Sequence, residues 1–210
     1  MPNMTKKKDL IAKVVSAEWK MFANVPNIGG KASCQEDYNT FEINRYSQVM
    51  SWSEATLDSY LNDLIEAEEN GRNLVTEKYA RMMQSTSPSE YAAIEHLIPR
   101  LDAEVLALIE KILEIVLKWE EMLAKKYPYI LRRGRQIHSS DDTPFATSLE
   151  AYLRGELATY SPVTIRLYYE DVLRQKSENV NGSEVILQHM MKRYGFNSLE
   201  EANEKLKAGV

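Results

Sequence analysis

Several features that would assign this 210-residue chain to a familiar class of protein are missing from its sequence. It contains one cysteine, Cys34, which excludes an internal disulfide and agrees with a reducing compartment. It has no basic surplus, because the formal net charge is −5. A general nucleic-acid binder usually carries excess positive charge, so nucleic acid is not expected as a partner.

The chain also lacks a long uninterrupted hydrophobic run. Its most apolar region, residues 105–123, still carries charged residues such as Glu110, Lys111 and Lys118 and is therefore not expected to span a bilayer. Charged residues also interrupt the stretch after the lysines at 6–8, which excludes the apolar core of a signal peptide. We expect a soluble cytoplasmic protein without a membrane partner.

Metal-ligand motifs are absent as well. Carboxylate-rich helices can hold a di-iron centre, but such sites need paired Glu-x-x-His motifs, and Glu95-His96 has the wrong spacing. We therefore expect no metal site and no cofactor.

What the sequence does contain is helical periodicity. Apolar residues recur at three- and four-residue steps almost throughout, and no alternating strand pattern is present. The fold class is predicted to be all-α: a single bundle-like domain, residues 1–210, of eight or nine helices around a long central helix at about residues 88–126. Pro99 should kink that helix or split it near residue 98. The irregular stretch at 127–147 is the point at which the domain would subdivide.

The expected central helix carries a heptad seam from Tyr91 to Met122. The seam predicts either a core helix that the other helices cover or a coiled coil in a homodimer. We favour the core helix and keep the homodimer as the alternative.

Polar residues on faces that should be apolar mark the candidate site. Glu18 lies four residues after Val14 within the apolar stripe of the first helix. Asp37, Arg45 and Gln48 share one face of the expected second helix. A buried carboxylate must be paired, and the planar fork of arginine matches it. These four residues are expected to converge, either as a structural network or as a pocket in which Arg45 and Gln48 bind a ligand and Glu18 or Asp37 acts as the catalytic acid or base.

The turn between these two helices supplies further candidates. Free amides at a helix N-terminus attract anions, and the glycine turn leads directly into one. The candidate ligand contacts are Asn27, Gly29, Gly30 and Gln35, although an ordinary inter-helix turn is the stronger interpretation. Cys34 is expected to be a packing residue rather than a nucleophile, because no histidine is near it in the sequence.

Arg133 and Arg135 lie in the irregular stretch and form a basic loop that could bind an anion. Arg133 and His138 have the spacing of the Arg-x4-His signature of helical ribonuclease domains that pair with minimal nucleotidyltransferases. Gly134 and the polar run after His138 favour a loop instead of the helix start on which that signature lies.

Several longer segments resemble an uncharacterised bacterial family, domain of unknown function four-one-two-five, over nearly the whole chain. The segments are residues 18–19, 27–37, 40–43, 60–64, 71–74, 77–83 and 152–157. The resemblance implies a single helical domain found mostly in anaerobic and gut bacteria. Some members are fused behind a nucleotidyltransferase-like domain, which implies a nucleotide or phosphorylated ligand and a nucleotidyltransferase-like partner protein. The family supplies no catalytic residues.

Three functional hypotheses follow. The first is a protein that binds or acts on a small anionic ligand, such as a nucleotide or another phosphorylated compound, between the first two helices. The second is a non-catalytic interaction module that uses the heptad seam. The third, a helical ribonuclease, requires Arg133 and His138 to lie together in a cleft.

Overall fold

The computed structural model describes residues 2–27 and 30–209, with the side chains of residues 2–5 left out. The described chain is all-α, as predicted, and apart from an isolated bridge between Thr143 and Ala146 it contains no β pairing. The α-helices are α1 (Pro2–Ala23), α2 (Tyr38–Val49), α3 (Glu54–Glu69), α4 (Leu74–Thr86), α5 (Pro88–Ile94), α6 (Ala103–Lys126), α7 (Pro128–Leu131), α8 (Leu149–Leu157), α9 (Pro162–Ser177), α10 (Gly182–Arg193) and α11 (Leu199–Ala208). Short 3₁₀ turns occur at Ser33–Glu36, Glu95–Leu97 and Ser139–Asp141.

Side-chain caps fix where many of these helices begin. Ser53, Asn73, Ser148 and Ser198 each accept a hydrogen bond from a backbone N–H in the first turn of the helix that follows. Such caps satisfy donors that the helix itself leaves unpaired. Because caps depend on local sequence, most of the helix starts were predictable.

The helix expected at residues 88–126 is not continuous: it is split close to residue 98, one of the two outcomes predicted for Pro99. The chain runs as α5, a 3₁₀ turn and an extended segment before α6 begins at Ala103. Pro99 accounts for the break, since it has no N–H to donate and it disfavours the α conformation in the residue before it. The break and the additional short helix α7 raise the number of α-helices in the described chain from the expected eight or nine to eleven.

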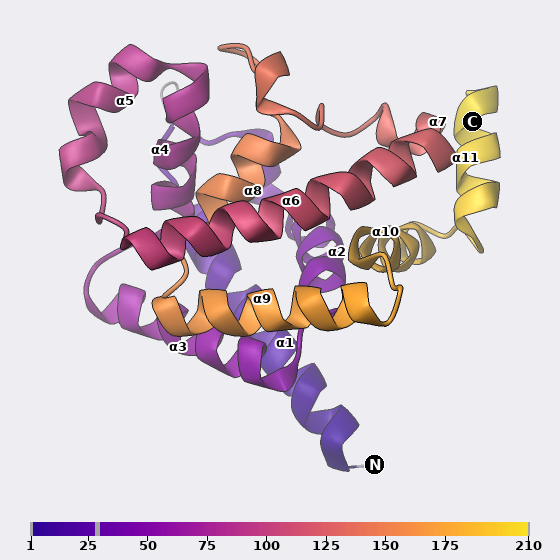
Figure 1. Ribbon diagram of the computed structural model, residues 1–210, viewed down its shortest axis with the longest axis horizontal. Helices are drawn as coiled ribbons and strands as arrows, with labels where there is room; N and C mark the ends of the chain where they lie inside the picture. The colour runs from indigo at the N-terminus through magenta and orange to yellow at the C-terminus, as the bar shows by residue number, and fades with distance from the viewer. Residues whose placement is uncertain (1, 28–29, 210) are drawn as a thin grey trace.

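Helix α6 crosses the middle of the molecule, with α8, α9 and α10 packed against it (Figure 1). Helix α3 packs on α1 and α9, while α4 pairs with α8. Helix α5 projects at one end beside α4, and α11 packs on α7 and α10 at the other end. The arrangement brings α1, α2, α3, α4 and α8 around one buried region.

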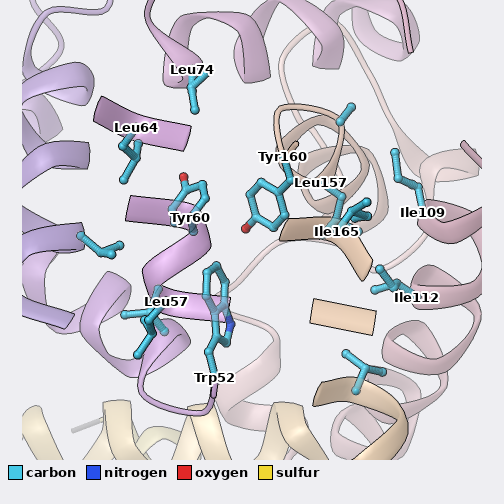
Figure 2. Close-up of a cluster of buried hydrophobic side chains, with 14 of the residues drawn as sticks. Trp52, Leu57, Tyr60, Leu64, Leu74, Ile109, Ile112, Leu157, Tyr160 and Ile165 are labelled. Atoms are coloured by element: carbon cyan, nitrogen blue, oxygen red, sulfur yellow. The ribbon is translucent and has the colours of Figure 1, made fainter. Parts of the chain in front are cut away.

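The core is a continuous apolar cluster that joins both halves of the sequence. Leu57 and Tyr60 from α3 face Leu157, Tyr160 and Ile165 from the second half, with Ile109 and Ile112 of α6 beyond them (Figure 2). Val105, Ile112 and Ile115, which belong to the heptad seam on α6, are buried in this core, whereas Met122 at the end of the seam is 61% exposed. The buried positions of the seam are therefore not free to bind a partner helix.

Candidate functional site

Glu18 of α1 and Arg45 of α2 meet in the interior, where each residue is only 5% exposed. The Arg45 Nε group donates a hydrogen bond to Oε2 of Glu18, and the Tyr60 hydroxyl donates to its Oε1 over 2.7 Å. The Arg45 Nη1 group donates to Oε1 of Gln48, one helical turn ahead, over 2.8 Å. The expected contacts of Arg45 with Glu18 and Gln48 are therefore present.

Two further charged residues complete this arrangement, and neither was proposed from the sequence. Glu156 of α8 accepts hydrogen bonds from Arg45 Nη1 and from Lys78 Nζ of α4, each over 2.7 Å. The Tyr160 hydroxyl donates to the same carboxylate over 2.9 Å. Lys78 and Glu156 are 8% and 7% exposed. Glu18, Arg45, Lys78 and Glu156 form one buried ion network.

The same pattern that identified Glu18 could have identified both missed residues. Lys78 lies between Val75 and Met82 on the apolar face of α4, and Glu156 follows Leu153 by three residues on α8. A charged residue within an apolar helical stripe is expected to be paired when buried. The sequence could not show that Lys78 and Glu156, which lie 78 residues apart in the chain, would form an ion pair.

Gly155 permits the close approach of α4 and α8 that joins Lys78 to Glu156. A Cβ atom at position 155 would lie 2.9 Å from the carbonyl oxygen of Lys78 and 3.1 Å from the Cγ atom of Met82. Only glycine leaves this space free without moving backbone. The glycine thus places the two charged residues in contact.

The buried ion network is electrically balanced, with two carboxylates and two cations. Burial opposes ionisation of Glu156, but Arg45 and Lys78 outweigh it and hold the pKa of its carboxyl well below the usual range. Burial also opposes the charge on Lys78, yet the facing carboxylate of Glu156 raises the pKa of the ammonium. Burial raises the pKa of Glu18, against the opposing effect of Arg45. Glu156 is therefore ionised and fully hydrogen-bonded, which makes it a poor general base.

Aromatic rings enclose the guanidinium of Arg45. Its Cζ atom lies 5.4 Å from the ring centroid of Trp52 and 5.6 Å from that of Tyr60. Its Nη2 group is buried and donates no hydrogen bond within the described chain. The π faces of the two rings offer this nitrogen an electrostatic partner. The arginine is held on all sides, as expected for a structural centre.

Asp37 does not join the network, and the prediction that it converges with Arg45 is wrong. Helix α2 begins only at Tyr38, and Asp37 is its N-cap, with the exposed carboxylate accepting from Thr40 N over 3.0 Å. That hydrogen bond lowers the pKa of Asp37. An N-cap residue lies outside the helix, so helical spacing did not apply to it.

The inter-helix turn is held together by Gln35. Its buried amide donates to the carbonyl oxygens of Phe22 and Val25 over 2.8 and 2.9 Å, and its oxygen accepts from Ala32 N and the Asn27 side chain. All its groups are engaged within the turn. Asn27 and Gln35 therefore stabilise the turn through hydrogen bonds within it.

Gly30 adopts a left-handed conformation, with φ of 103°, that glycine tolerates best, whereas Gly29 lies outside the described residues. The helix expected directly after the turn is a single 3₁₀ turn, Ser33–Glu36. A short 3₁₀ turn lacks the aligned dipoles of an α-helix, so the case for an anion cradle is weak. Cys34 is exposed in this turn.

A cavity of about 400 Å³ opens beside the buried ion network, between α2, α6, α7, α8 and α10. We call it the central cavity. Arg45, Gln48 and Glu156 form a polar part of its wall, whereas Glu18 does not reach it. Most of the remaining wall is apolar: Trp52, Val116, Leu123, Ile130, Leu131, Ile137, Leu149, Leu153, Ile186, Leu187, Met190 and Met191.

Arg133 and Arg135 border the central cavity from the segment after α7, and both are exposed. Arg135 donates to the carbonyl oxygen of Thr147 over 2.9 Å and stacks over the Tyr152 ring at 4.7 Å. Within the described chain neither arginine forms an ion pair with a carboxylate. The predicted basic loop thus lies at the mouth of a cavity, and His138, which pairs with Glu121 and Glu150, does not line it.

Glu120 of α6 also lines the central cavity. Burial raises the pKa of its carboxyl, and Ser183 opposes the shift through a hydrogen bond. Unlike Glu18 and Glu156, this carboxyl has no cationic partner in the described part of the protein.

The described residues contain no cluster of histidine, cysteine or acidic side chains that could hold a metal ion. None of the described helices is long and apolar enough to cross a membrane. Neither the homodimer nor the nucleotidyltransferase-like partner is tested by these contacts, and both stay predictions.

Comparison with known proteins gives one result. No curated protein and no solved structure matches the chain. A family model described as a protein of unknown function, DUF4125, matches residues 8–204 and therefore includes every member of the buried ion network and the whole wall of the central cavity. The match confirms the resemblance seen in the sequence: the chain belongs to the DUF4125 family.

Proposed function

We propose that the protein binds a small anionic ligand with an apolar body in the central cavity. The observation that carries the proposal is the pairing of an apolar cavity with a cationic mouth, formed by Arg133 and Arg135. Ligand sites commonly have volumes of 300–1,000 Å³ and combine mostly apolar walls with a few polar groups. The volume of about 400 Å³ falls within that range.

Charge balance favours one orientation of the ligand. The buried ion network beside the inner wall already contains two cations and two carboxylates, so an anion pushed against Glu156 would meet repulsion in a low-dielectric site. At the mouth, Arg133 and Arg135 have no such carboxylate. The apolar body therefore points inward toward Leu153 and Met190, and the anionic group stays with the two arginines.

The inner end of the ligand meets the side chain of Gln48. Its oxygen accepts from Arg45 over 2.8 Å, while its amide N–H groups make no hydrogen bond within the described residues. They are available for an oxygen atom of the ligand. This arrangement differs from the expected direct contact with Arg45, whose guanidinium is already engaged.

The chemistry supported here is binding rather than catalysis. Glu156 accepts three hydrogen bonds and stays ionised, and Glu18 lies behind Arg45, away from the cavity. A general base must reach the proton it removes. Of the acidic residues with a raised pKa, only Glu120 lines the central cavity, and the Ser183 hydroxyl beside it hydrogen-bonds its carboxyl.

Decanoate, which joins an apolar chain to one carboxylate, is a suitable probe for calorimetric titration, with 1-decanol as its uncharged control. Arg133→Ser should weaken decanoate binding about tenfold, because a charge-assisted hydrogen bond is lost. Arg132→Ser is the matched control, since Arg132 is equally exposed, stacks on Tyr129 and does not line the central cavity.

Ile186→Trp should fill part of the cavity and weaken decanoate and decanol alike. Equal decanoate affinity in wild type, Arg133→Ser and Ile186→Trp would contradict the proposal, as would the absence of binding to wild type. Circular dichroism of each variant confirms that it remains folded.

A further inference from the structure

A second, larger cleft of about 800 Å³ lies at the other side of α8, between α4, α5, α6 and the segment that joins α5 to α6. We call it the α5 cleft. Helix α5, from which Tyr91 lines this cleft, projects as an arm from the body of the molecule beside α4 (Figure 1). Helix α5 has no buried residue and packs mainly on α4. The cleft is thus bounded on one side by the core and on the other by a lightly packed arm.

The distribution of arginines separates this cleft from the rest of the surface. The arginines that pair with carboxylates are Arg45, Arg72, Arg154, Arg166, Arg174 and Arg193. The others form no ion pair within the described chain, and except for Arg132 each of them lines a cavity. Arg133 and Arg135 border the central cavity, while Arg81 and Arg100 line the α5 cleft.

Arg81 is the more informative of the two cleft arginines. Its Nη2 group donates to the carbonyl oxygen of Pro99 over 2.6 Å, which fixes the guanidinium against the segment after α5. Its Nε group is buried and donates no hydrogen bond within the described chain. Burial lowers the pKa of this guanidinium, and the opposing effects of Tyr91 and of the Glu77 carboxylate only partly offset the shift. A half-buried arginine that is fixed in place and forms no ion pair in the described chain is suited to an incoming anion.

We propose that the α5 cleft binds a phosphate monoester that carries an apolar or aromatic group. Arg81 and Arg100 supply two positive charges that form no ion pair in the described chain, and together they match a phosphate dianion better than a carboxylate. The side chains of His96, Gln84 and Ser85, which can hydrogen-bond to a ligand, also line the cleft. This inference does not depend on the function proposed for the central cavity, because the two sites share no lining residue.

The opposite wall accounts for the apolar part of the ligand. Ile98, Leu101, Leu106 and Ile109 line the cleft beside the arginines, and Leu106 is 48% exposed although it is a large apolar residue. The Tyr91 ring, from α5, also lines the cleft. Among the other charged residues that line the cleft, Arg154 forms ion pairs with Glu110 and Glu150. Glu95 forms no ion pair within the described chain. A bare phosphate ion would leave these apolar surfaces exposed to water.

The test is calorimetric titration of the full chain with phenyl phosphate, with benzoate and inorganic phosphate as comparison ligands. Phenyl phosphate should bind more tightly than either. Arg100→Ser should weaken it about tenfold, since Arg100 is exposed and forms no bond whose loss would unfold the protein. Leu106→Glu, which adds a competing carboxylate to the cleft, should weaken it further, whereas Leu106→Gln should not.

Arg133→Ser is the control that distinguishes the two sites, and it should leave phenyl phosphate affinity unchanged. Three results would overturn the inference. The first is a dissociation constant of phenyl phosphate for wild type above about 1 mM, near the weak limit of specific binding. The second is equal phenyl phosphate affinity of wild type, Arg100→Ser and Leu106→Glu, and the third is loss of affinity in Arg133→Ser alone. The last result would place the phosphate in the central cavity instead. Failure of decanoate to bind would refute the earlier proposal and leave this one intact.

Discussion

The buried ion network makes a quantitative prediction for the isosteric substitution Glu156→Gln. The substitution removes one negative charge from a cluster of two carboxylates and two cations: Arg45 keeps its ion pair with Glu18, while Lys78 loses its carboxylate partner. Glutamine keeps one acceptor oxygen and nearly the same shape, so packing is preserved. The loss of stability therefore reports the removed charge rather than a change in side-chain volume.

Breaking a buried ion pair by removing one partner costs about 3–5 kcal/mol, because the remaining charge is left uncompensated in the interior. Each hydrogen bond to an ionised group contributes about 1.5–3 kcal/mol, and Glu156 accepts three, of which glutamine can keep only some. We therefore expect Glu156→Gln to lower the free energy of unfolding by about 3–5 kcal/mol. Urea unfolding followed by far-UV circular dichroism at pH 7 measures it.

A double-mutant cycle separates this effect from a general loss of packing. Lys78→Met combined with Glu156→Gln restores charge balance, since Glu18 and Arg45 then remain as a matched pair. The double variant should be more stable than the sum of the single losses predicts, by about 2 kcal/mol. The control is Glu104→Gln, which breaks an exposed pair with Arg166 and should leave the stability nearly unchanged. A loss below about 1 kcal/mol for Glu156→Gln, or strict additivity in the cycle, would refute the reasoning.

Three other predictions concern stability. Gly155→Ala should cost about 1–3 kcal/mol in thermal or urea unfolding, because its Cβ would lie 2.9 Å from a backbone oxygen, whereas Gly134→Ala, with its nearest contact at 3.5 Å, should be neutral. Asp37→Ala should lower the melting temperature by removing an N-cap and leave decanoate affinity unchanged, while Asp37→Asn retains the cap; a change in affinity would reassign Asp37 to the site. Because the pKa of Glu156 is lower in the folded than in the unfolded protein, its ionised carboxylate stabilises the fold fully above the pKa of an unfolded glutamate, ~4.3. This contribution is lost as the pH falls toward the pKa of Glu156 in the folded protein. Between pH ~5 and ~3 the free energy of unfolding should therefore fall more steeply in wild type than in Glu156→Gln. Parallel pH curves of the free energy of unfolding for the two proteins would contradict this prediction.

Local sequence was enough to establish the helical fold. Residues such as Ser53, Asn73 and Ser198 cap the helices that follow them, and both the apolar period and the caps are short-range features. Two local tendencies competed at residues 88–126, where either a kink or a split was expected and the split is found. An apolar period favoured one helix at 88–126, but Pro99 ended the first part of it.

Only part of the candidate site could be predicted from the sequence. Charge on an apolar face identified Glu18 and Arg45, because a buried charge requires a partner wherever that partner lies in the sequence. Asp37 was misplaced, since the exact start of α2 decides whether helical spacing applies to it. Arg133 and Arg135 were singled out as a basic loop, but nothing in their surroundings along the chain showed that they border a cavity.

The sequence by itself determined that this protein is helical, where most of its helices begin, and that Glu18 and Arg45 had to be paired. These properties depend on spacing and capping within a few residues. The tertiary structure alone decided that Lys78 and Glu156 complete the buried ion network and that two cavities with unpaired arginines open on either side of α8. The reason is physical: Lys78 and Glu156 belong to helices far apart in the sequence, and only the packing of α4 against α8 at Gly155 brings them within hydrogen-bonding distance.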